Sequence, residues 1–300
     1  MANQILVIGS SNTDMVVKAD KLPAPGETVL GGTFLMNPGG KGANQAVAAA
    51  RLGGDVTFVA KVGNDMFGQQ AVNGFRQEGI RIDYVLTDTE NPSGVALINV
   101  DAAGENSITV APGSNANLQP AETDAALEQT ESNAIVLIQL ETPLPTVGYV
   151  VRKATERGLR VILNPAPAQT LPPDLLAHLF LITPNETEAE LLTGIHVNDV
   201  ATAEQAAQKL RELGISNVVI TLGAKGAYIS TDDVKQLVTG PRVTAVDSTA
   251  AGDCFNGALA VSLAEGQSWT EAVTFACKAA SLSVTRMGAQ ASMPTRDEVI

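Results

Sequence analysis

The sequence predicts an α/β protein with a doubly wound, mainly parallel sheet flanked by helices, and with a small β-sheet lid. Apolar β-type runs alternate with helical patterns along most of the 300 residues. This alternation is typical of parallel strands joined by right-handed crossovers. Two β-rich regions interrupt it, so we expect them to pair with each other in a smaller sheet that could close over a site.

The composition argues against several classes of protein. The net charge is −13 and no run of Lys and Arg exceeds two residues, so no nucleic-acid or membrane partner is expected. No apolar run approaches the roughly 18 residues of a membrane span, and the first residues lack the basic region of a signal peptide. Cys254 and Cys277 both lie in helical patterns, which indicates a reducing compartment. A cytoplasmic protein is therefore expected.

The N-terminal part contains the first strand and the first helix. A strand is expected at 5–8, because a continuous apolar run suits a strand that is buried on both faces. The region 16–36 is rich in Pro, Gly and β-formers and predicts short strands with turns. A helix should begin within Asn37-Pro-Gly-Gly-Lys-Gly-Ala-Asn44, where glycines permit close backbone approach. Neither a P-loop nor a dinucleotide-binding fingerprint is complete there.

Strands and helices then follow one another regularly. Strands are expected at 56–62, 134–140, 159–163, 179–182 and 217–221. Helices are expected at 66–78, 144–157 and 200–213, and a further helix should open within 183–188. The runs 94–100 and 106–111 predict a hairpin. The predicted lid therefore comprises 15–38 and 94–111, and the large domain comprises 1–14, 39–93 and 112–300.

The rest of the chain is organised around the stretch Asp247-Ser-Thr-Ala-Ala-Gly-Asp-Cys-Phe-Asn-Gly257. A β-type run at 242–246 is expected to lead into it, and a helical pattern follows at 255–263. The small residues in its turn allow backbone N–H groups at a helix start to approach an anion. Asp253 stands at that helix start, either as an N-terminal cap or as a base beside a bound phosphoryl group.

Five polar or glycine positions each stand just after a predicted strand: Asp14, Glu141, Asn185, Gly223 and Asp253. Each one alone is more simply explained as a turn residue or a helix cap. In an open α/β sheet, however, the carboxyl ends of the strands share one edge, and ligands bind there. The five positions together therefore predict a site on this edge.

These motifs resemble the ribokinase-like (PfkB) family of carbohydrate kinases over nearly the whole chain. The resemblance rests on Gly39–Asn44, Asn185-x-x-Glu188, Thr221–Gly226, Ala250–Asp253 and Thr285–Ala289. It implies ATP-dependent phosphorylation of D-ribose at O5. A kinase for deoxyribose, a nucleoside or another sugar, and a sugar-binding protein without catalysis, remain as alternatives.

The resemblance also implies roles for individual residues. Asp253 is the expected base, and the N–H groups of Ala250, Ala251 and Gly252 are the expected anion hole. The expected sugar site comprises Asn12, Asp14, Gly40, Lys41, Asn44, Glu141 and Asp253, with apolar cover from Ala96 and Ile108 of the lid. ATP is expected at Asn185, Thr221, Gly223, Gly226, Gly252 and Cys277, and Glu188 should order Mg²⁺ through water.

A monovalent cation is expected near the anion turn. Asp247 precedes this turn by three residues and would repel a bound polyphosphate unless a positive charge lay between them. The resemblance implies K⁺ at Asp247, Thr249, Ser283, Arg286, Gly288 and Ser292, and oxygen ligands suit such a cation. It also implies a homodimer formed through the lid. Ser248 and Cys254 depart from the family pattern, in which Thr is common at both positions, and the C-terminal helix of some relatives is expected to be short or absent here.

Overall fold

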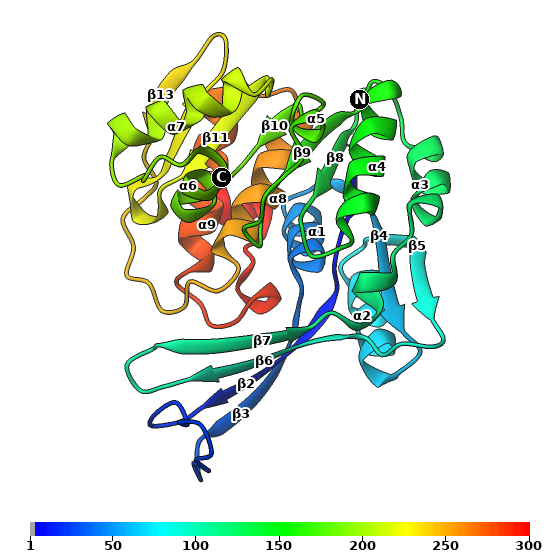
Figure 1. Ribbon diagram of the computed structural model, residues 1–300, viewed down its shortest axis with the longest axis vertical. Coiled ribbons are helices and arrows are strands. Elements are labelled where there is room, and N and C mark those ends of the chain that lie inside the picture. The colour runs from blue at the N-terminus through cyan, green and yellow to red at the C-terminus, as the bar shows by residue number, and fades with distance from the viewer. Residues whose placement is uncertain (1–3) are drawn as a thin grey trace.

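A large sheet forms the centre of the computed structural model, which describes residues 4–300. Its nine strands have the order β13-β12-β11-β10-β9-β8-β1-β4-β5. All neighbours from β11 to β5 are parallel, and β12 is antiparallel to both of its neighbours, β11 and β13. Helices cover both faces (Figure 1). The predicted doubly wound, mainly parallel architecture is therefore confirmed.

The elements of the large domain have the following bounds. The strands are β1 (Gln4–Ile8), β4 (Asp55–Gly63), β5 (Arg81–Asp88), β8 (Ile135–Ile138), β9 (Arg160–Leu163), β10 (Leu181–Ile182), β11 (Asn217–Thr221), β12 (Ala227–Ser230) and β13 (Lys235–Val238). The helices are α1 (Lys41–Arg51), α2 (Met66–Gln77), α3 (Asp124–Gln129), α4 (Leu144–Glu156), α5 (Pro173–Leu176), α6 (Glu186–Thr193), α7 (Val200–Glu212), α8 (Ala251–Ala264), α9 (Trp269–Ser283) and α10 (Arg296–Val299). Short 3₁₀ turns are η1 (Gly113–Asn117), η2 (Pro120–Thr123), η3 (Gly223–Lys225) and η4 (Gln290–Ser292).

The central strands are buried on both faces, as their continuous apolar runs predict. In β1, Ile5 and Val7 belong to the core shared with α1, α8 and α9, whereas Leu6 and Ile8 belong to the core shared with α4 and α7. Successive side chains of a strand point to opposite faces. Strands with helices on both faces therefore need an apolar residue at every position.

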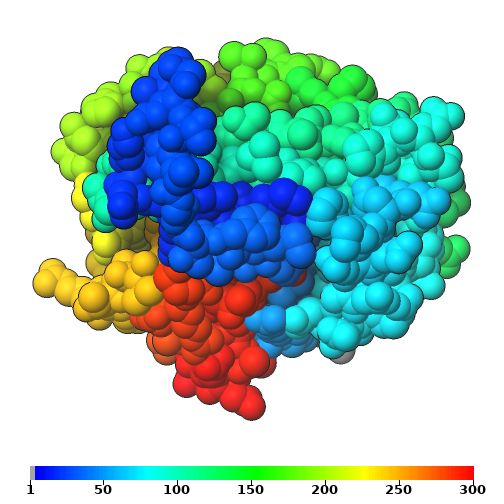
Figure 2. Space-filling view, turned by 90° about the horizontal axis from the view of Figure 1, so that it is seen from below, coloured from blue at the N-terminus to red at the C-terminus, as the bar shows by residue number. Residues whose placement is uncertain are grey.

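The predicted lid is a separate four-stranded sheet with the order β3-β2-β6-β7. Its strands are β2 (Asn12–Lys18), β3 (Thr33–Gly39), β6 (Gly94–Val100) and β7 (Asn106–Ala111). The sheet extends below the helices in Figure 1, and Figure 2 shows its N-terminal strands, in blue, beside the C-terminal segments in red. Because β2 begins at Asn12 and β3 ends at Gly39, the sheet includes 12–14 and 39, which the sequence analysis placed in the large domain.

The prediction of a strand at 242–246 is wrong, because residues 239–250 contain neither helix nor strand. The edge of the sheet is instead formed by the hairpin β12–β13, which the sequence analysis did not identify. Residues 241–246 lie exposed beyond that edge. The segment is held to the end of α9, where Val246 N and Asp247 N both donate to Val284 O, at 2.7 and 3.1 Å. β-propensity alone does not produce a strand, because strand formation depends on the tertiary context.

No helix in the part of the chain that the structure describes combines the length and the apolarity that crossing a bilayer requires.

Candidate active site

Asp253 lies in the first turn of α8 and is almost completely buried. Asn44 Nδ2 donates to its Oδ2 and Gln45 Nε2 donates to its Oδ1, both at 2.9 Å. The N-cap position of α8 is Ala250, and no side chain caps this helix. The carboxylate of Asp253 is therefore directed toward α1, and Asp253 does not act as an N-terminal cap of α8.

Glycines allow α1 to approach α8 closely enough for these hydrogen bonds. A Cβ atom added to Gly257 would lie 2.7 Å from Ala48 Cβ and 2.8 Å from Gln45 O, distances that real Cβ atoms essentially never show. A Cβ atom on Gly42 would similarly lie 2.6 Å from the Gly9 carbonyl carbon. Only residues without a side chain permit this approach, which places the start of α1 against both α8 and the end of β1.

The charged groups of the site lie close enough to act on one another electrostatically. They are the carboxylates of Asp14, Glu141, Glu188 and Asp253 and the ammonium group of Lys41. Burial, together with Glu141 and Asp253, raises the pKa of Asp14 to about 6. Burial also raises the pKa of Asp253 itself, whereas Lys41 opposes this shift. The burial of Lys41 would lower its pKa, but the neighbouring carboxylates outweigh that effect and raise it. Lys41 therefore stays charged and offsets part of the negative charge of the site.

Two predicted sugar-site residues, Asp14 and Glu141, are held by specific contacts. The carboxylate of Asp14 rests on the Cα of Gly39, where an added Cβ would lie 2.3 Å from Asp14 Oδ2. Glu141 Oε2 accepts from Ser10 Oγ at 2.5 Å and from Lys41 N at 3.0 Å. Glu141 therefore satisfies a free backbone N–H at the start of α1.

One face of the lid carries Asp14 of the predicted sugar site together with the lid residues Ala96 and Ile108. Cross-strand pairing places Asp14, Ala96 and Val110 in one row, so their side chains point to the same face of the small sheet. Ile108 lies two residues from Val110 on the same face. The Ala96 side of the lid therefore faces in the same direction as Asp14.

The turn before α8 is built around Asp247. Its Oδ1 accepts from Thr249 N at 2.9 Å and from Thr249 Oγ1 at 2.6 Å, and its Oδ2 accepts from Gly288 N at 2.9 Å. Burial would raise the pKa of Asp247, but these hydrogen bonds outweigh it and the pKa lies below its ordinary value. Ala250 has φ 58°, a left-handed conformation that is rare for a residue with a side chain. The turn is thus tied to the segment after α9.

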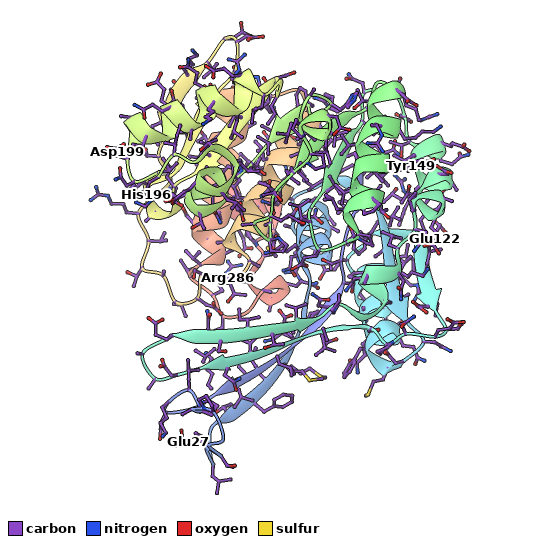
Figure 3. All side chains as sticks on the ribbon, viewed as in Figure 1. Glu27, Glu122, Tyr149, His196, Asp199 and Arg286 are labelled. Atoms are coloured by element: carbon purple, nitrogen blue, oxygen red, sulfur yellow. The ribbon has the colours of Figure 1, made fainter. Side chains whose placement is uncertain are left out.

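The other predicted cation ligands lie on that segment or at the end of α9. Ser283 and Ser292 are buried, and their hydroxyls donate to Ala280 O and Ala289 O, at 2.9 and 2.8 Å. The guanidinium group of Arg286, labelled in Figure 3, forms an ion pair with Glu298. Because a guanidinium is cationic and has no acceptor, Arg286 could bind a cation only through its backbone carbonyl. Among residues 4–300, no group of three or more His, Cys, Asp and Glu side chains could hold a metal ion.

The predicted nucleotide residues come from several elements: Asn185 follows β10, Thr221 ends β11, Gly223 and Gly226 follow β11, Gly252 lies in α8 and Cys277 lies on α9. Asn185 Oδ1 accepts from Glu188 N at 2.8 Å and Glu188 Oε2 accepts from Asn185 N at 2.9 Å. This reciprocal pair is a capping box, so both side chains stabilise the start of α6. Burial raises the pKa of Glu188. An added Cβ at Gly223, near the end of β11, or at Gly252, in α8, would meet no other part of the protein within 4 Å, so both positions face open space.

Sequence reasoning assigned no role to the buried polar residues that surround Asp253 and Glu141. These are Ser10, Gln45, Gln139 and Asn164. Gln139 and Asn164 follow directly after β8 and β9. The rule that singled out Glu141 and Asn185 could therefore have found these two. Gln45 lies within the Ala-rich helix α1, and no local signal distinguishes it from a core position.

The fold and this site have the features of a sugar kinase, and comparison with known proteins agrees. The model of the pfkB family of carbohydrate kinases matches residues 2–296. The chain belongs to this family, and it is a kinase.

Relatives and solved structures are similar over their full lengths. The chain is 44% identical to a ribokinase of Haemophilus influenzae, covering 100% of this chain and 98% of the relative, and 46% identical to one of Bacillus subtilis, covering 98% and 97%. A deoxyribokinase of Salmonella typhimurium is 37% identical, covering 98% and 96%. The structure of Arabidopsis thaliana ribokinase complexed with ribose and ATP has a TM-score of 0.93 at 36% identity, covering 100% and 98%.

Proposed function

We propose that this kinase phosphorylates D-ribose at O5 with ATP and forms ribose 5-phosphate. The observation that carries the proposal is the buried carboxylate of Asp253 directly beside the small-residue turn at the start of α8. The resemblance to proteins named ribokinase, at 44% and 46% identity, supports ribose as the sugar. The solved complex of a relative with ribose and ATP supports the same pair of substrates.

In the proposed mechanism Asp253 accepts the proton of the sugar's primary hydroxyl as that oxygen attacks the γ-phosphate. The backbone N–H groups of Ala250, Ala251 and Gly252 stabilise the charge on the transferring phosphoryl group, and that of Ala251 exchanges its present acceptor, Ser248 O at 3.2 Å, for the phosphoryl oxygen. Lys41, with its raised pKa, adds a fixed positive charge near the base. Glu188 is the carboxylate that would hold Mg²⁺ through water, and Mg²⁺ would neutralise charge on the phosphates.

Sugar selectivity tests the proposed function directly. Asp14 is proposed to accept hydrogen bonds from adjacent sugar hydroxyls, including the one that 2-deoxyribose lacks. A buried polar group that loses its partner costs free energy, so kcat/KM should be at least tenfold higher for ribose than for 2-deoxyribose, an estimate at the low end of such effects. Steady-state assays with both sugars give this ratio. Equal values for the two sugars would favour a deoxyribokinase instead. That alternative is a concrete one, because a deoxyribokinase is among the relatives.

We also propose that K⁺ binds near Asp247 and supports the anion turn. Replacing K⁺ by Na⁺ or tetramethylammonium at constant ionic strength should lower activity several-fold, because a smaller or bulkier cation fits the same oxygen ligands poorly. Asp247→Ala should abolish this dependence on the cation. Equal activity in all three salts, in enzyme freed of K⁺ by dialysis, would show that no functional cation site exists.

The lid is proposed to form a homodimer, because its apolar side chains are exposed. Phe34, Met36, Leu97, Ile108 and Val110 are each at least 44% exposed. Sedimentation of the double variant Leu97→Asp/Ile108→Asp should show monomers at concentrations at which the unchanged protein is dimeric. The matched control Met66→Asp/Leu191→Asp introduces the same charges at exposed apolar residues outside the lid, and it should leave the dimer intact. A dimer that survives the lid substitutions would contradict the proposal.

A further inference from the structure

Asp253 is joined to a buried chain of side-chain amides that begins at Gln45. Gln45 Nε2 donates to Asp253 Oδ1 at 2.9 Å and to Asn164 Oδ1 at 3.0 Å. Gln139 Nε2 donates to Gln45 Oε1 at 2.7 Å. Gln45 and Gln139 have no exposed surface. Because its oxygen is held by one donor and its nitrogen by two acceptors, the amide of Gln45 cannot turn over without losing all three hydrogen bonds.

The chain of hydrogen bonds continues beneath the site and returns to α8. Asn164 Nδ2 donates to Thr183 O at 3.3 Å, and Thr183 Oγ1 donates to Asn256 Oδ1 at 2.6 Å. Asn256 Nδ2 then donates to Gly252 O at 2.8 Å. The network therefore starts at the carboxylate of Asp253 and ends at the carbonyl of the residue before it. It passes through α1, the ends of β9 and β10, and α8.

We propose that Gln45 is a positioning residue, which holds the carboxylate of Asp253 in the orientation for accepting the proton of the sugar hydroxyl. This inference rests on the proposed function. Gln45 and Asn44 each donate to a different oxygen of the carboxylate, so its plane is fixed by two contacts from α1. A carboxylate has about four acceptor positions, so capacity remains for a substrate hydroxyl. Gln139 and Asn164 fix Gln45 in turn, as pre-organised sites require.

A purely structural role is the competing explanation, since buried networks also hold elements together. The two explanations differ in kinetics. A structural role predicts a lower melting temperature with unchanged chemistry in the protein that remains folded. A positioning role predicts a lower kcat at temperatures far below melting, with little change in the KM of either substrate.

The first experiment is the substitution Gln45→Met, which keeps the length of the side chain and removes both of its donors. We expect kcat to fall by about 10²-fold, the loss typical of small misplacements of reacting groups, and both KM values to stay within about twofold, since no substrate contact is removed. The acid limb of the kcat–pH profile should move to higher pH, because the ionised carboxylate loses a donor. The charged groups acting on Asp253 are unchanged in this variant: Lys41, Asp14, Glu141 and Glu188.

Two further variants separate positioning from stability. Gln139→Met removes the group that orients Gln45 without touching Asp253, and it should lower kcat in the same direction by a smaller factor. Asn217→Leu removes an amide that donates to Phe180 O at 2.8 Å, at the amino end of β11. This control should lower the melting temperature without moving the acid limb.

Titration of the Asp253 carboxyl by NMR in the substrate-free protein tests the inference without any assay. Its pKa should be higher in Gln45→Met than in the unchanged protein, and higher to a smaller extent in Gln139→Met. If the unchanged protein does not phosphorylate ribose, the proposed function fails while this titration still decides the role of Gln45. Unchanged kcat, acid limb and carboxyl pKa in folded Gln45→Met would overturn the inference. If Gln45→Met fails to fold, an unchanged kcat, acid limb and Asp253 pKa in folded Gln139→Met would overturn the inference.

Discussion

Asp253→Asn is expected to reduce kcat by at least about 10²-fold, because it removes the only group proposed to accept the proton of the sugar hydroxyl. The new side chain has nearly the same shape, so nucleotide binding measured by calorimetry should change little. It offers one acceptor and one donor in place of two acceptors. One of the two amides that now donate to the carboxylate, on Asn44 or Gln45, would therefore face another donor, and we expect a lower melting temperature as well.

The chain provides a matched control for this substitution. Asp199 also stands at a helix start, and its carboxylate caps α7 by accepting from Thr202 N at 2.8 Å. Asn is an equally good N-cap, so Asp199→Asn should retain full activity and near-normal stability. Retention of more than about a tenth of kcat in Asp253→Asn, against the 10²–10⁴-fold expected of a general base, would reject Asp253 as the base.

Gly39→Ala is expected to lower kcat/KM for ribose by about 10²-fold, the size typical when a substrate-positioning group moves by about 1 Å. The added methyl group would lie within 2.4 Å of all three atoms of the Asp14 carboxyl group. Because these atoms form the end of a side chain, the carboxyl group can rotate away. The fold should therefore survive while the proposed sugar contact is lost. Steady-state kinetics with varied ribose and a melting curve measure the two effects.

A double substitution identifies the cause of that loss. In the Asp14→Ala background, Gly39→Ala should cause no further decrease, because the group that it displaces is already absent. An equal decrease in both backgrounds would instead indicate a distorted backbone at Gly39. Gly74→Ala is the matched control, since an added Cβ there meets no atom within 4 Å. Gly74 is half-buried in α2, and the added methyl group should stabilise the helix slightly and leave kcat/KM unchanged.

The sequence by itself was sufficient for the class of fold, although not for every strand of the large sheet. Continuous apolar runs such as 5–8 predicted strands buried on both faces, and the two β-rich interruptions predicted a separate small sheet. These signals are local, because hydrophobic periodicity reports directly which faces of an element are buried. The same local evidence predicted a strand at 242–246 that is absent. Residues 242–246 pair with no strand, and Val246 N donates instead to Val284 O at the end of α9.

Only the tertiary structure shows that Asp253 is not a helix cap, which leaves the proposed base as its role. Its position at a helix start favours a cap when the stretch is taken alone, and the two roles differ in the direction of the carboxylate. That direction is set by Asn44 and Gln45, which are 209 and 208 residues away in the sequence. Their approach depends on Gly257 lying directly against α1. Contacts between elements so far apart in the chain arise from packing, so no window of sequence around Asp253 contains the information that determines its partners.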